Sequence, residues 1–216
     1  MKRRSKSHKT PRILVTAGPT REYIDPVRYL SNDSSGRMGF ALARAAVHLG
    51  CSATLIAGPV DLDTPSGVTR IDVTSATEMQ RAALRHSKGS DIIIMAAAVA
   101  DFRPFKISKA KIKKTSRNAK GLSLKLKRNP DILAELSKSK RKDQIIVGFA
   151  LETAALEKNA RKKMKDKCCD FIIANSAKSI GADVSSATLF GRGKKVRLPR
   201  LPKEDLAIII LSHILG

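Results

Sequence analysis

Five short apolar runs alternate along this chain with stretches whose apolar residues recur at helical spacing. Each run has the length of a strand, and the five occupy residues 13–16, 53–57, 91–98, 144–149 and 170–174. Strands that are apolar throughout are buried on both faces, and the connections between parallel strands are usually helical. The sequence therefore predicts an α/β fold with a doubly wound, mostly parallel sheet and helices on both faces.

Helices are expected between these runs and at the C-terminus. Gly50 is well placed to end the first of them, and Pro130 followed by Asp131 is a favourable start for the third. The predicted helices cover residues 39–49, 76–87, 130–137, 154–167 and 203–215.

The length of 216 residues, 42% of them hydrophobic, is enough for one domain with a sizeable core. We expect a single domain over residues 12–216 with a disordered basic segment over residues 1–11 before it. No apolar run approaches the roughly 20 residues of a membrane span. The basic N-terminus also lacks the apolar region of a secretory signal. The expected location is the cytoplasm, without membrane attachment.

The formal net charge of +23 is large, and it is concentrated. From residue 102 to residue 130 the chain has no acidic residue, whereas lysines are frequent. Such a charge favours a polyanion as partner, so a non-catalytic basic α/β protein that binds RNA or another polyanion is the alternative hypothesis. A solvated basic surface also explains the charge. The chain has no zinc-finger spacing and no basic-zipper heptads, which makes nucleic acid the weaker of the candidate partners.

Residues 102–129 interrupt the regular alternation, because lysines stand where core residues would be expected. Long loops without hydrophobic periodicity of their own are commonly functional. We interpret residues 103–121 as a basic flap and residues 122–126 as a short alternating strand after it.

The segment before the first predicted helix has the composition of an anion-binding site. An amide, two hydroxyls and two glycines stand at the mouth of this apolar helix: Asn32, Ser34, Ser35, Gly36 and Gly39. Free N–H groups at a helix start and the positive end of the helix dipole attract anions. The chain lacks both the Gly-x-Gly-x-x-Gly fingerprint of nicotinamide-binding domains and the phosphate loop of ATPases.

Small residues follow the third apolar run, where Ala96, Ala97, Ala98 and Ala100 precede Asp101. Ligands of doubly wound sheets bind beyond the carboxyl ends of the strands. The alanines would let a bulky ligand approach the backbone and meet exposed N–H groups, and Asp101 would suit a metal-bound phosphate or a ribose hydroxyl. Close helix packing is the alternative reason for small residues here.

The predicted helix at residues 154–167 carries two lysines on one face. Lys163 and Lys167 lie one turn apart, beside an apolar stripe that we expect to face the core. A solvated face is the default interpretation of such lysines. The sharper interpretation is a triphosphate site, because two ammonium groups on one row can bind one anion.

Six motifs in this order resemble those of phosphopantothenoylcysteine synthetase. They are NDSSG at residues 32–36, AAAVAD at 96–101, KIKK at 111–114, KRNPDI at 127–132, GFALET at 148–153 and AN at 174–175. The resemblance covers residues 12–214 and implies a Rossmann-like fold. Bacterial members are often fused to a flavin-dependent decarboxylase. The few residues before residue 12 could not form one, so we expect a stand-alone synthetase without FMN.

The resemblance implies a ligase that joins 4'-phosphopantothenate to the amine of L-cysteine in coenzyme A biosynthesis. The pantothenate carboxylate attacks the α-phosphorus of CTP to give acyl-CMP and pyrophosphate, and the cysteine amine then displaces CMP. Neither step needs an enzyme nucleophile, and the chain has no recognisable Ser-His-Asp or Cys-His arrangement. The triphosphate implies Mg²⁺, with Asp101 as the nearby carboxylate. CTP is expected rather than ATP because Asn129-Pro130-Asp131-Ile132 is of the bacterial type.

The resemblance also assigns roles to residues. Asn32 is expected to hold the reacting acyl group, and Lys111 to close with the flap over the triphosphate. The positions that match the phosphopantothenate site are Arg28, Ser34, Ser35, Gly36, Arg37, Met38 and Ala98. The positions that match the nucleotide site are Met95, Ala96, Ala97, Asp101, Lys111, Pro130, Asp131, Ile132, Leu133, Phe149, Lys163 and Lys167. A homodimer is implied as well, with residues 122–126 and 194–198 as candidate contact strands.

Overall fold

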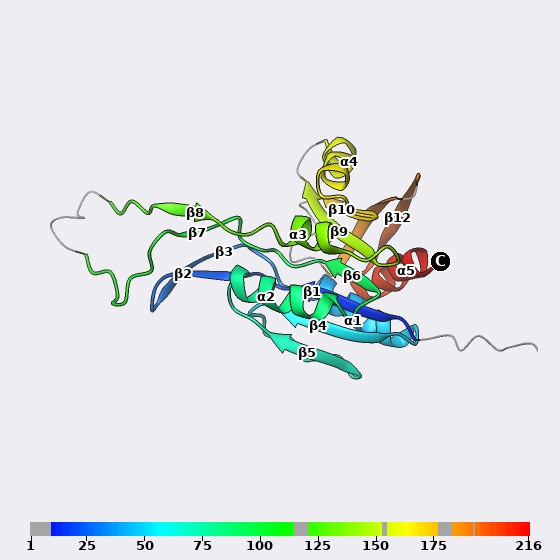
Figure 1. Ribbon diagram of the computed structural model, residues 1–216, viewed down its shortest axis with the longest axis horizontal. Helices are drawn as coiled ribbons and strands as arrows, with labels where there is room; N and C mark the ends of the chain where they lie inside the picture. The colour runs from blue at the N-terminus through cyan, green and yellow to red at the C-terminus, as the bar shows by residue number, and fades with distance from the viewer. Residues whose placement is uncertain (1–9, 115–120, 153–154, 177–182, 192) are drawn as a thin grey trace, which may run out of the picture.

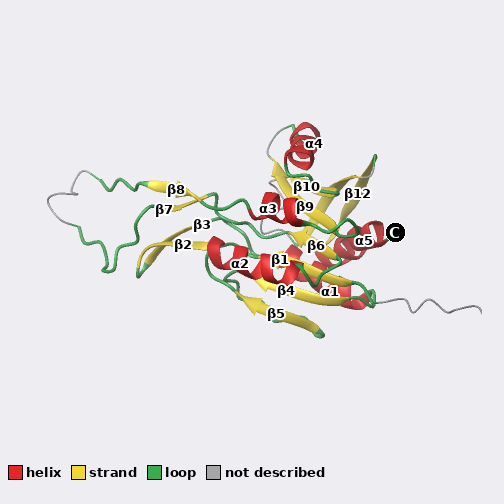
Figure 2. Cartoon of the chain, viewed as in Figure 1, coloured by secondary structure: helices red, strands yellow, loops and turns green. Residues whose placement is uncertain are grey.

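A central sheet with helices on both faces forms the body of the molecule (Figure 1, Figure 2). The computed structural model describes residues 10–114, 121–152, 155–176, 183–191 and 193–216. Its main sheet has eight described strands in the order β12-β11-β10-β9-β6-β1-β4-β5. They are β1 (Arg12–Ala17), β4 (Ser52–Ala57), β5 (Val68–Asp72), β6 (Ile92–Met95), β9 (Ile145–Glu152), β10 (Phe171–Ser176), β11 (Val184–Gly191) and β12 (Lys194–Pro202). All neighbouring strands from β5 to β10 in this order run parallel, whereas β11 runs antiparallel to both of its neighbours, β10 and β12. The predicted mostly parallel, Rossmann-like sheet is confirmed.

Helices cover both faces of this sheet, as the layers in Figure 2 show. One face carries α1 (Arg37–His48) and α5 (Lys203–Leu215), and the other carries α2 (Ala76–Ser87), α3 (Ile132–Ser139) and α4 (Leu156–Asp166). Because successive strand residues point to opposite faces, Ile13 and Val15 pack with α1 and α5, whereas Leu14 packs with α2 and α3. None of the helices described is long and apolar enough to span a membrane.

The predicted elements coincide with observed ones, with shifts at their ends. Helices α2 and α5 have the predicted bounds, but α3 begins at Ile132 because the side chain of Asp131 caps it, accepting the Ala134 N–H at 3.0 Å. The apolar run at residues 91–98 is a strand only as far as Met95. Two strands of the main sheet, β5 and β11, were not predicted, because each has several exposed positions and therefore no continuous apolar run.

Two hairpins project from the body, to the left in Figure 1. They are formed by β2 (Arg21–Asp25) with β3 (Arg28–Ser31), and by β7 (Phe102–Pro104) with β8 (Leu126–Arg128). We call β2 and β3 together with residues 102–114 and 121–128 the projection. Its two hairpins are joined, since the Ser108 N–H donates to the carbonyl of Ile24 at 2.9 Å.

The projection corrects part of the sequence analysis. The strand predicted at residues 122–126 lies instead at Leu126–Arg128, where it pairs with β7. The strand predicted at 194–198 is confirmed as part of β12, at the edge of the main sheet. Residues 115–120 of the predicted flap and residues 1–9 of the predicted disordered segment lie outside the described residues.

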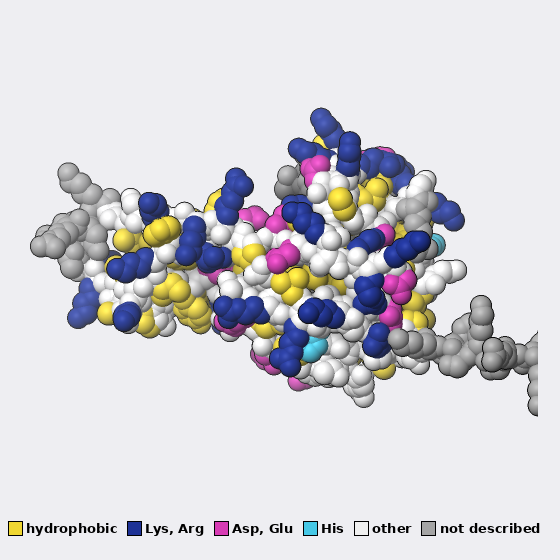
Figure 3. Space-filling model, in the orientation of Figure 1, with side chains coloured by type: hydrophobic (Ala, Val, Ile, Leu, Met, Phe, Trp, Pro, Cys, Tyr) yellow, Lys and Arg dark blue, Asp and Glu magenta, His cyan; other side chains and the backbone are white. Residues whose placement is uncertain are grey.

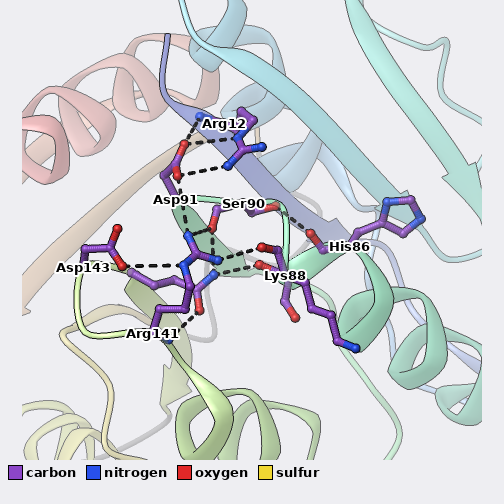
Figure 4. A network of polar contacts seen from close by, with 9 residues as sticks. Arg12, His86, Lys88, Ser90, Asp91, Arg141 and Asp143 are labelled. Carbon is purple, nitrogen blue, oxygen red and sulfur yellow. Dashed lines mark hydrogen bonds and ion pairs between the residues drawn. The ribbon is translucent and has the colours of Figure 1, made fainter. Parts of the chain in front are cut away.

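A polar network ties together the amino ends of β1, β6 and β9 (Figure 4). Asp91 accepts the backbone N–H of Arg12 at 2.9 Å, and Arg141 donates to the carbonyl oxygens of Lys88 at 2.7 Å and Ser90 at 3.0 Å. These bonds satisfy backbone groups at the start of β1 and just before β6, through side chains that precede β6 and β9. Because the three strands run parallel, their carboxyl ends lie together at the opposite edge.

Candidate functional site

A cavity of about 960 Å³ lies beyond the carboxyl ends of β6, β9 and β10. It brings together every residue that sequence analysis proposed for the site except Arg28 and Lys111. The proposed residues that line it are Asn32, Ser34, Ser35, Gly36, Arg37, Met38, Met95, Ala96, Ala97, Ala98, Asp101, Pro130, Asp131, Ile132, Leu133, Phe149, Lys163 and Lys167. Asn129, Asn175 and Lys203 also line it, although they had not been selected.

The first turn of α1 forms one wall of this cavity. Gly36 precedes the helix with a φ of 74°, a left-handed conformation that favours glycine. Gly39 allows the helix to approach β1, since a Cβ there would lie 2.4 Å from the Cβ of Ala17. Among the residues described, no side chain caps α1. The first N–H groups of the helix and its positive dipole end are therefore available to an anion in the cavity.

Asn32 connects this wall to the segment that follows β6. Its Nδ2 donates hydrogen bonds to the carbonyl oxygens of Ala98 at 3.3 Å and Val99 at 3.1 Å. Two acceptors for the same NH₂ group fix the orientation of the amide and turn its oxygen away from them. The Asn32 oxygen can therefore accept a hydrogen bond from a ligand, for example from an amine.

The alanine segment after β6 differs from the prediction in one respect. Its N–H groups are not exposed, because those of Ala97 and Ala100 donate to the hydroxyls of Thr16 at 3.2 Å and Thr20 at 3.0 Å. The N–H of Ala98 likewise donates to the carbonyl of Gly18 at 2.9 Å. The small side chains still leave room for a ligand, but this segment offers it a surface rather than a row of donors.

Asn129 holds the opposite wall in position. Its Nδ2 donates to the carbonyl of Ala100 at 2.7 Å, and its Oδ1 accepts a hydrogen bond from Arg103 at 2.6 Å. Its backbone N–H donates to the backbone carbonyl of Asp101 at 2.8 Å. Asn129 thus joins the base of the projection to the segment after β6. Because it directly precedes residues 130–133, these contacts also fix where that segment begins beside the cavity.

Lys163 and Lys167 line the cavity on the side of α4, which agrees with the sharper interpretation of their spacing and not with the default of a solvated face. Lys163 donates to the carbonyl of Phe149 at 2.7 Å, and Lys167 forms an ion pair with Asp131. Burial raises the pKa of Asp131, but the hydrogen bonds from Lys167 and the Ala134 N–H and the charge of Lys163 together lower it below 3.8. Asp131 is therefore ionised at neutral pH and neutralises part of the positive charge of this wall.

Lys203 and Asn175 are two further polar residues of the cavity that sequence analysis did not select as site residues. Lys203 is 6% exposed, and Asn175 is 8% exposed at the end of β10. The Oδ1 atom of Asn175 is buried without a hydrogen-bond partner in the described structure. Asn175 belongs to one of the six motifs and could have been selected on that ground. The sequence gives no comparable signal for Lys203, which follows a proline at the start of a C-terminal helix.

Arg28 and Lys111 lie on the projection and do not line the cavity. The guanidinium of Arg28 donates to the buried carboxylate of Asp25 at 2.6 Å and to the carbonyl of Ile112 at 2.5 Å. Ile112 is the neighbour of Lys111 in the chain. The structure thus brings Arg28 and Lys111 into one part of the molecule, away from the other proposed residues.

The residues present fit a Mg²⁺ ion that arrives with a triphosphate. No group of three potential metal-ligating His, Cys, Asp or Glu residues occurs within the described part of the chain. Asp101 supplies one exposed carboxylate at the rim, and Asp131 is paired with Lys167. Mg²⁺ is commonly bound by one or two carboxylates together with substrate phosphates and water, so a single rim carboxylate suits it.

The cavity favours binding and charge stabilisation over covalent catalysis. Its described lining includes no His and no Cys, so neither a Ser-His nor a Cys-His pair is present in it. It does provide a helix N-terminus, lysines from α4 and α5 and three amide side chains, those of Asn32, Asn129 and Asn175. Such groups suit reactions in which phosphate charge must be held and reactants aligned.

Residues 8–216 match the family described as DNA/pantothenate metabolism flavoprotein C-terminal domain. The coenzyme A biosynthesis bifunctional protein CoaBC of Bacillus subtilis (strain 168) is 48% identical over 208 residues, 94% of this chain and 50% of the relative. The protein of the same name from Escherichia coli (strain K12) is 42% identical over 206 residues, 94% of this chain and 51% of the relative. The chain thus spans about half the length of these curated relatives.

Solved structures resemble this fold closely. A crystal structure of the C-terminal domain of a CoaBC protein has a TM-score of 0.82 at 38% identity and covers 97% of this chain and 96% of its own. The Cab2 mutant H337A in complex with phosphopantothenate-cysteine has a TM-score of 0.77 at 17% identity and covers 95% and 85%. At that identity the Cab2 similarity concerns the fold alone.

Proposed function

The chain belongs to the family of the DNA/pantothenate metabolism flavoprotein C-terminal domain, and on this premise we propose that it joins 4'-phosphopantothenate to L-cysteine. The product is 4'-phosphopantothenoyl-L-cysteine, an amide formed in coenzyme A biosynthesis. The relatives from Bacillus subtilis and Escherichia coli are named for coenzyme A biosynthesis, which supports this assignment.

One observation carries the proposal: a single cavity joins an anion site at α1 with the wall formed by α3 and α4. The α1 side has hydroxyls, free N–H groups and the Asn32 amide, which suit an acidic pantothenate substrate. The other side has Lys163 and Lys167, which suit the phosphates of a nucleotide. A ligation through an acyl-nucleotide needs both substrates side by side, as this cavity allows.

The proposed reaction has two steps. A carboxylate oxygen of phosphopantothenate forms a bond to the α-phosphorus of CTP, and the bond to the β-phosphate breaks to release pyrophosphate. The amine of cysteine then forms a bond to the acyl carbon, loses a proton and displaces CMP. Asn32 holds the acyl group, while Lys163 and Lys167 hold the phosphates and stabilise the charge that develops there.

Lys111 and Mg²⁺ complete this proposal. Lys111 lies on the projection, and closure of the flap would bring its ammonium to the triphosphate. When bound, Mg²⁺ would supply positive charge that stabilises the phosphates, and Asp101 would hold it. FMN has no role in either step, and the proposal does not require it.

CTP is the proposed nucleotide, although the phosphate contacts alone would serve ATP equally. Residues 130–133 stand at the cavity, and backbone groups there could read the base. The test is to incubate the protein with phosphopantothenate, cysteine and Mg²⁺ and either CTP or ATP, and to detect the amide product by mass spectrometry. Product with CTP supports the proposal. Product with ATP alone would keep the ligase but make ATP its nucleotide, and no product with either nucleotide refutes the ligase.

We also propose a homodimer that forms through the projection. Its exposed apolar side chains include Phe105 at 57% and Ile107 at 58% exposed, and Figure 3 shows apolar surface gathered there. Contiguous apolar surface of this kind usually marks an interaction site. Analytical ultracentrifugation tests it: the protein should sediment as a dimer and Ile107→Glu as a monomer. Sedimentation of the wild-type protein as a monomer would refute the dimer.

A further inference from the structure

Lys203 is a buried lysine at the start of α5 whose side chain lines the cavity. It comes from the far end of the chain, but α5 packs beside α1 on the same face of the sheet. The first residues of both helices, Arg37 and Met38 in α1 and Lys203 in α5, therefore meet at one cavity. Two positive helix ends thus lie at the same wall.

The position of Lys203 is electrostatically unfavourable in the absence of an anion. A cation in the first turn of a helix meets the positive end of the dipole. Burial lowers the pKa of Lys203, and the charge of Arg37 lowers it further, against the opposing charges of Asp183 and Glu204. The Lys203 side chain is 6% exposed and lines the cavity, so a contact with an anion there would offset this unfavourable charge.

The neighbouring carboxylates do not provide that contact. Asp183 forms an ion pair with Arg37 and is 82% exposed at its side chain, and Glu204 pairs with Arg44 at 3.4 Å. Within the described residues, no carboxylate forms an ion pair with Lys203, and no oxygen accepts a hydrogen bond from its ammonium. An anion in the cavity would supply this acceptor.

We propose that Lys203 binds the phosphate of a phosphate monoester at the α1 end of the cavity. The anion would lie between the N–H groups of α1, the hydroxyls of Ser34 and Ser35, and the ammonium of Lys203. A phosphate fits because its three terminal oxygens can accept hydrogen bonds from all of these donors. The identity of the monoester as 4'-phosphopantothenate rests on the proposed function, whereas the anion site rests on the burial and surroundings of Lys203.

The test compares 4'-phosphopantothenate with pantothenate, which lacks the phosphate. Dissociation constants are measured by calorimetry for the wild-type protein and for Lys203→Met, Lys203→Arg and Lys142→Met. Lys142 is exposed and follows Arg141 at the amino ends of the strands, so it controls for the lost charge. Thermal unfolding of each variant checks that the fold is intact.

Lys203→Met is expected to weaken phosphopantothenate binding by about 10- to 100-fold, the range for a hydrogen bond to a charged group. Its affinity for pantothenate should change little, Lys203→Arg should retain part of the preference for the phosphate, and Lys142→Met should behave as the wild type. Equal weakening for both ligands would indicate a merely structural role and would overturn the inference. Unchanged binding of phosphopantothenate would also overturn it.

Turnover measured in parallel separates this inference from the proposed function. If Lys203→Met loses the preference for phosphopantothenate over pantothenate but the wild-type protein forms no product, the anion site is supported and the ligase is refuted. If the protein forms product and Lys203→Met prefers phosphopantothenate over pantothenate as strongly as the wild type does, the ligase is supported and the role of Lys203 is refuted.

Discussion

The carboxylate of Asp25 accepts a hydrogen bond from the backbone N–H of Ile112 at 3.1 Å, across 87 positions of sequence. The same carboxylate accepts hydrogen bonds from the guanidinium of Arg28, which in turn donates to the carbonyl of Ile112. Both backbone groups of Ile112 are therefore held by the two residues that flank the turn between β2 and β3. This contact fixes the neighbour of Lys111 relative to Arg28, and it makes the two residues parts of one unit.

Asp25→Asn should weaken this unit while the body of the fold remains. The side chain keeps its size, but it loses the charge that attracts Arg28 and has one acceptor oxygen instead of two. We expect kcat to fall by about 10- to 100-fold, the cost of a misplaced catalytic group. Trypsin should also cleave faster after the lysines near Ile112. Asp63→Asn, at an exposed position in the loop before β5, is the control. Wild-type cleavage and kcat in Asp25→Asn would contradict the positioning role.

Acid should destabilise the protein partly through Asp25. Burial raises the pKa of this carboxyl, but hydrogen bonds from Ile112, Val27 and Arg28 and the charge of Arg28 outweigh burial and lower it from 3.8 to about 2. The unfolded chain therefore takes up this proton first as the pH falls, and the stabilisation by ionised Asp25 is present above 3.8 and lost toward about 2. Urea unfolding at several pH values between 5 and 2.5 measures this loss of stability, because that interval includes the ordinary pKa range of carboxyl groups. The free energy of unfolding should fall more steeply with acid in the wild type than in Asp25→Asn. Parallel curves would show that Asp25 does not contribute.

Asn32→Asp should remove activity without unfolding the protein. Asn32 is exposed, but an oxygen in place of its Nδ2 would face the carbonyl oxygens of Ala98 and Val99 and turn away from them. The group that holds the acyl intermediate would thus be displaced and would carry a negative charge. Turnover is expected to fall about 100- to 1,000-fold, the size of effect seen when one hydrogen-bonding group at a reacting centre is lost. Product formation and circular dichroism are measured together. Near-normal turnover with a native spectrum would exclude Asn32 from the reaction.

Lys163→Met and Lys167→Met should each weaken nucleotide binding. Both side chains line the cavity, and each contributes a positive charge near the proposed phosphates. The KM for CTP should rise by about 10-fold or more, while the KM for phosphopantothenate stays within twofold. Lys162→Met is the matched control, because Lys162 is exposed on the same helix and does not line the cavity. An equal rise in the KM for both substrates would argue against a phosphate site at α4.

The sequence predicted the body of the fold well because each buried strand and each amphipathic helix has a local signature. The strand-end rule predicted the part of the cavity that follows Met95, and the resemblance to the family implied most of the other lining residues, including Phe149. The bonds that use up the N–H groups of Ala97 and Ala100 depend on Thr16 and Thr20, which lie 81 and 80 positions away. Such distant partners cannot be inferred from the residues next to Ala97 and Ala100 in the sequence.

Lys203 illustrates the same difficulty for the site. In the sequence it is one basic residue among 42 lysines and arginines, at the start of an apolar helix. Only the packing of α5 beside α1 places it at the cavity and buries it. The projection was also hard to predict, because β7 and β8 have three residues each and pair across more than twenty intervening positions.

Pyrophosphate release tests the central claim most directly. The protein is mixed with phosphopantothenate, Mg²⁺ and CTP, first without cysteine and then with it. Without cysteine, we expect a single burst of pyrophosphate about equal to the enzyme concentration, because the acyl-CMP has no acceptor. Addition of cysteine should convert the burst into continuous release with equal amounts of CMP. No pyrophosphate with either CTP or ATP, from a folded protein with its substrates present, would contradict the ligase and make polyanion binding the next hypothesis.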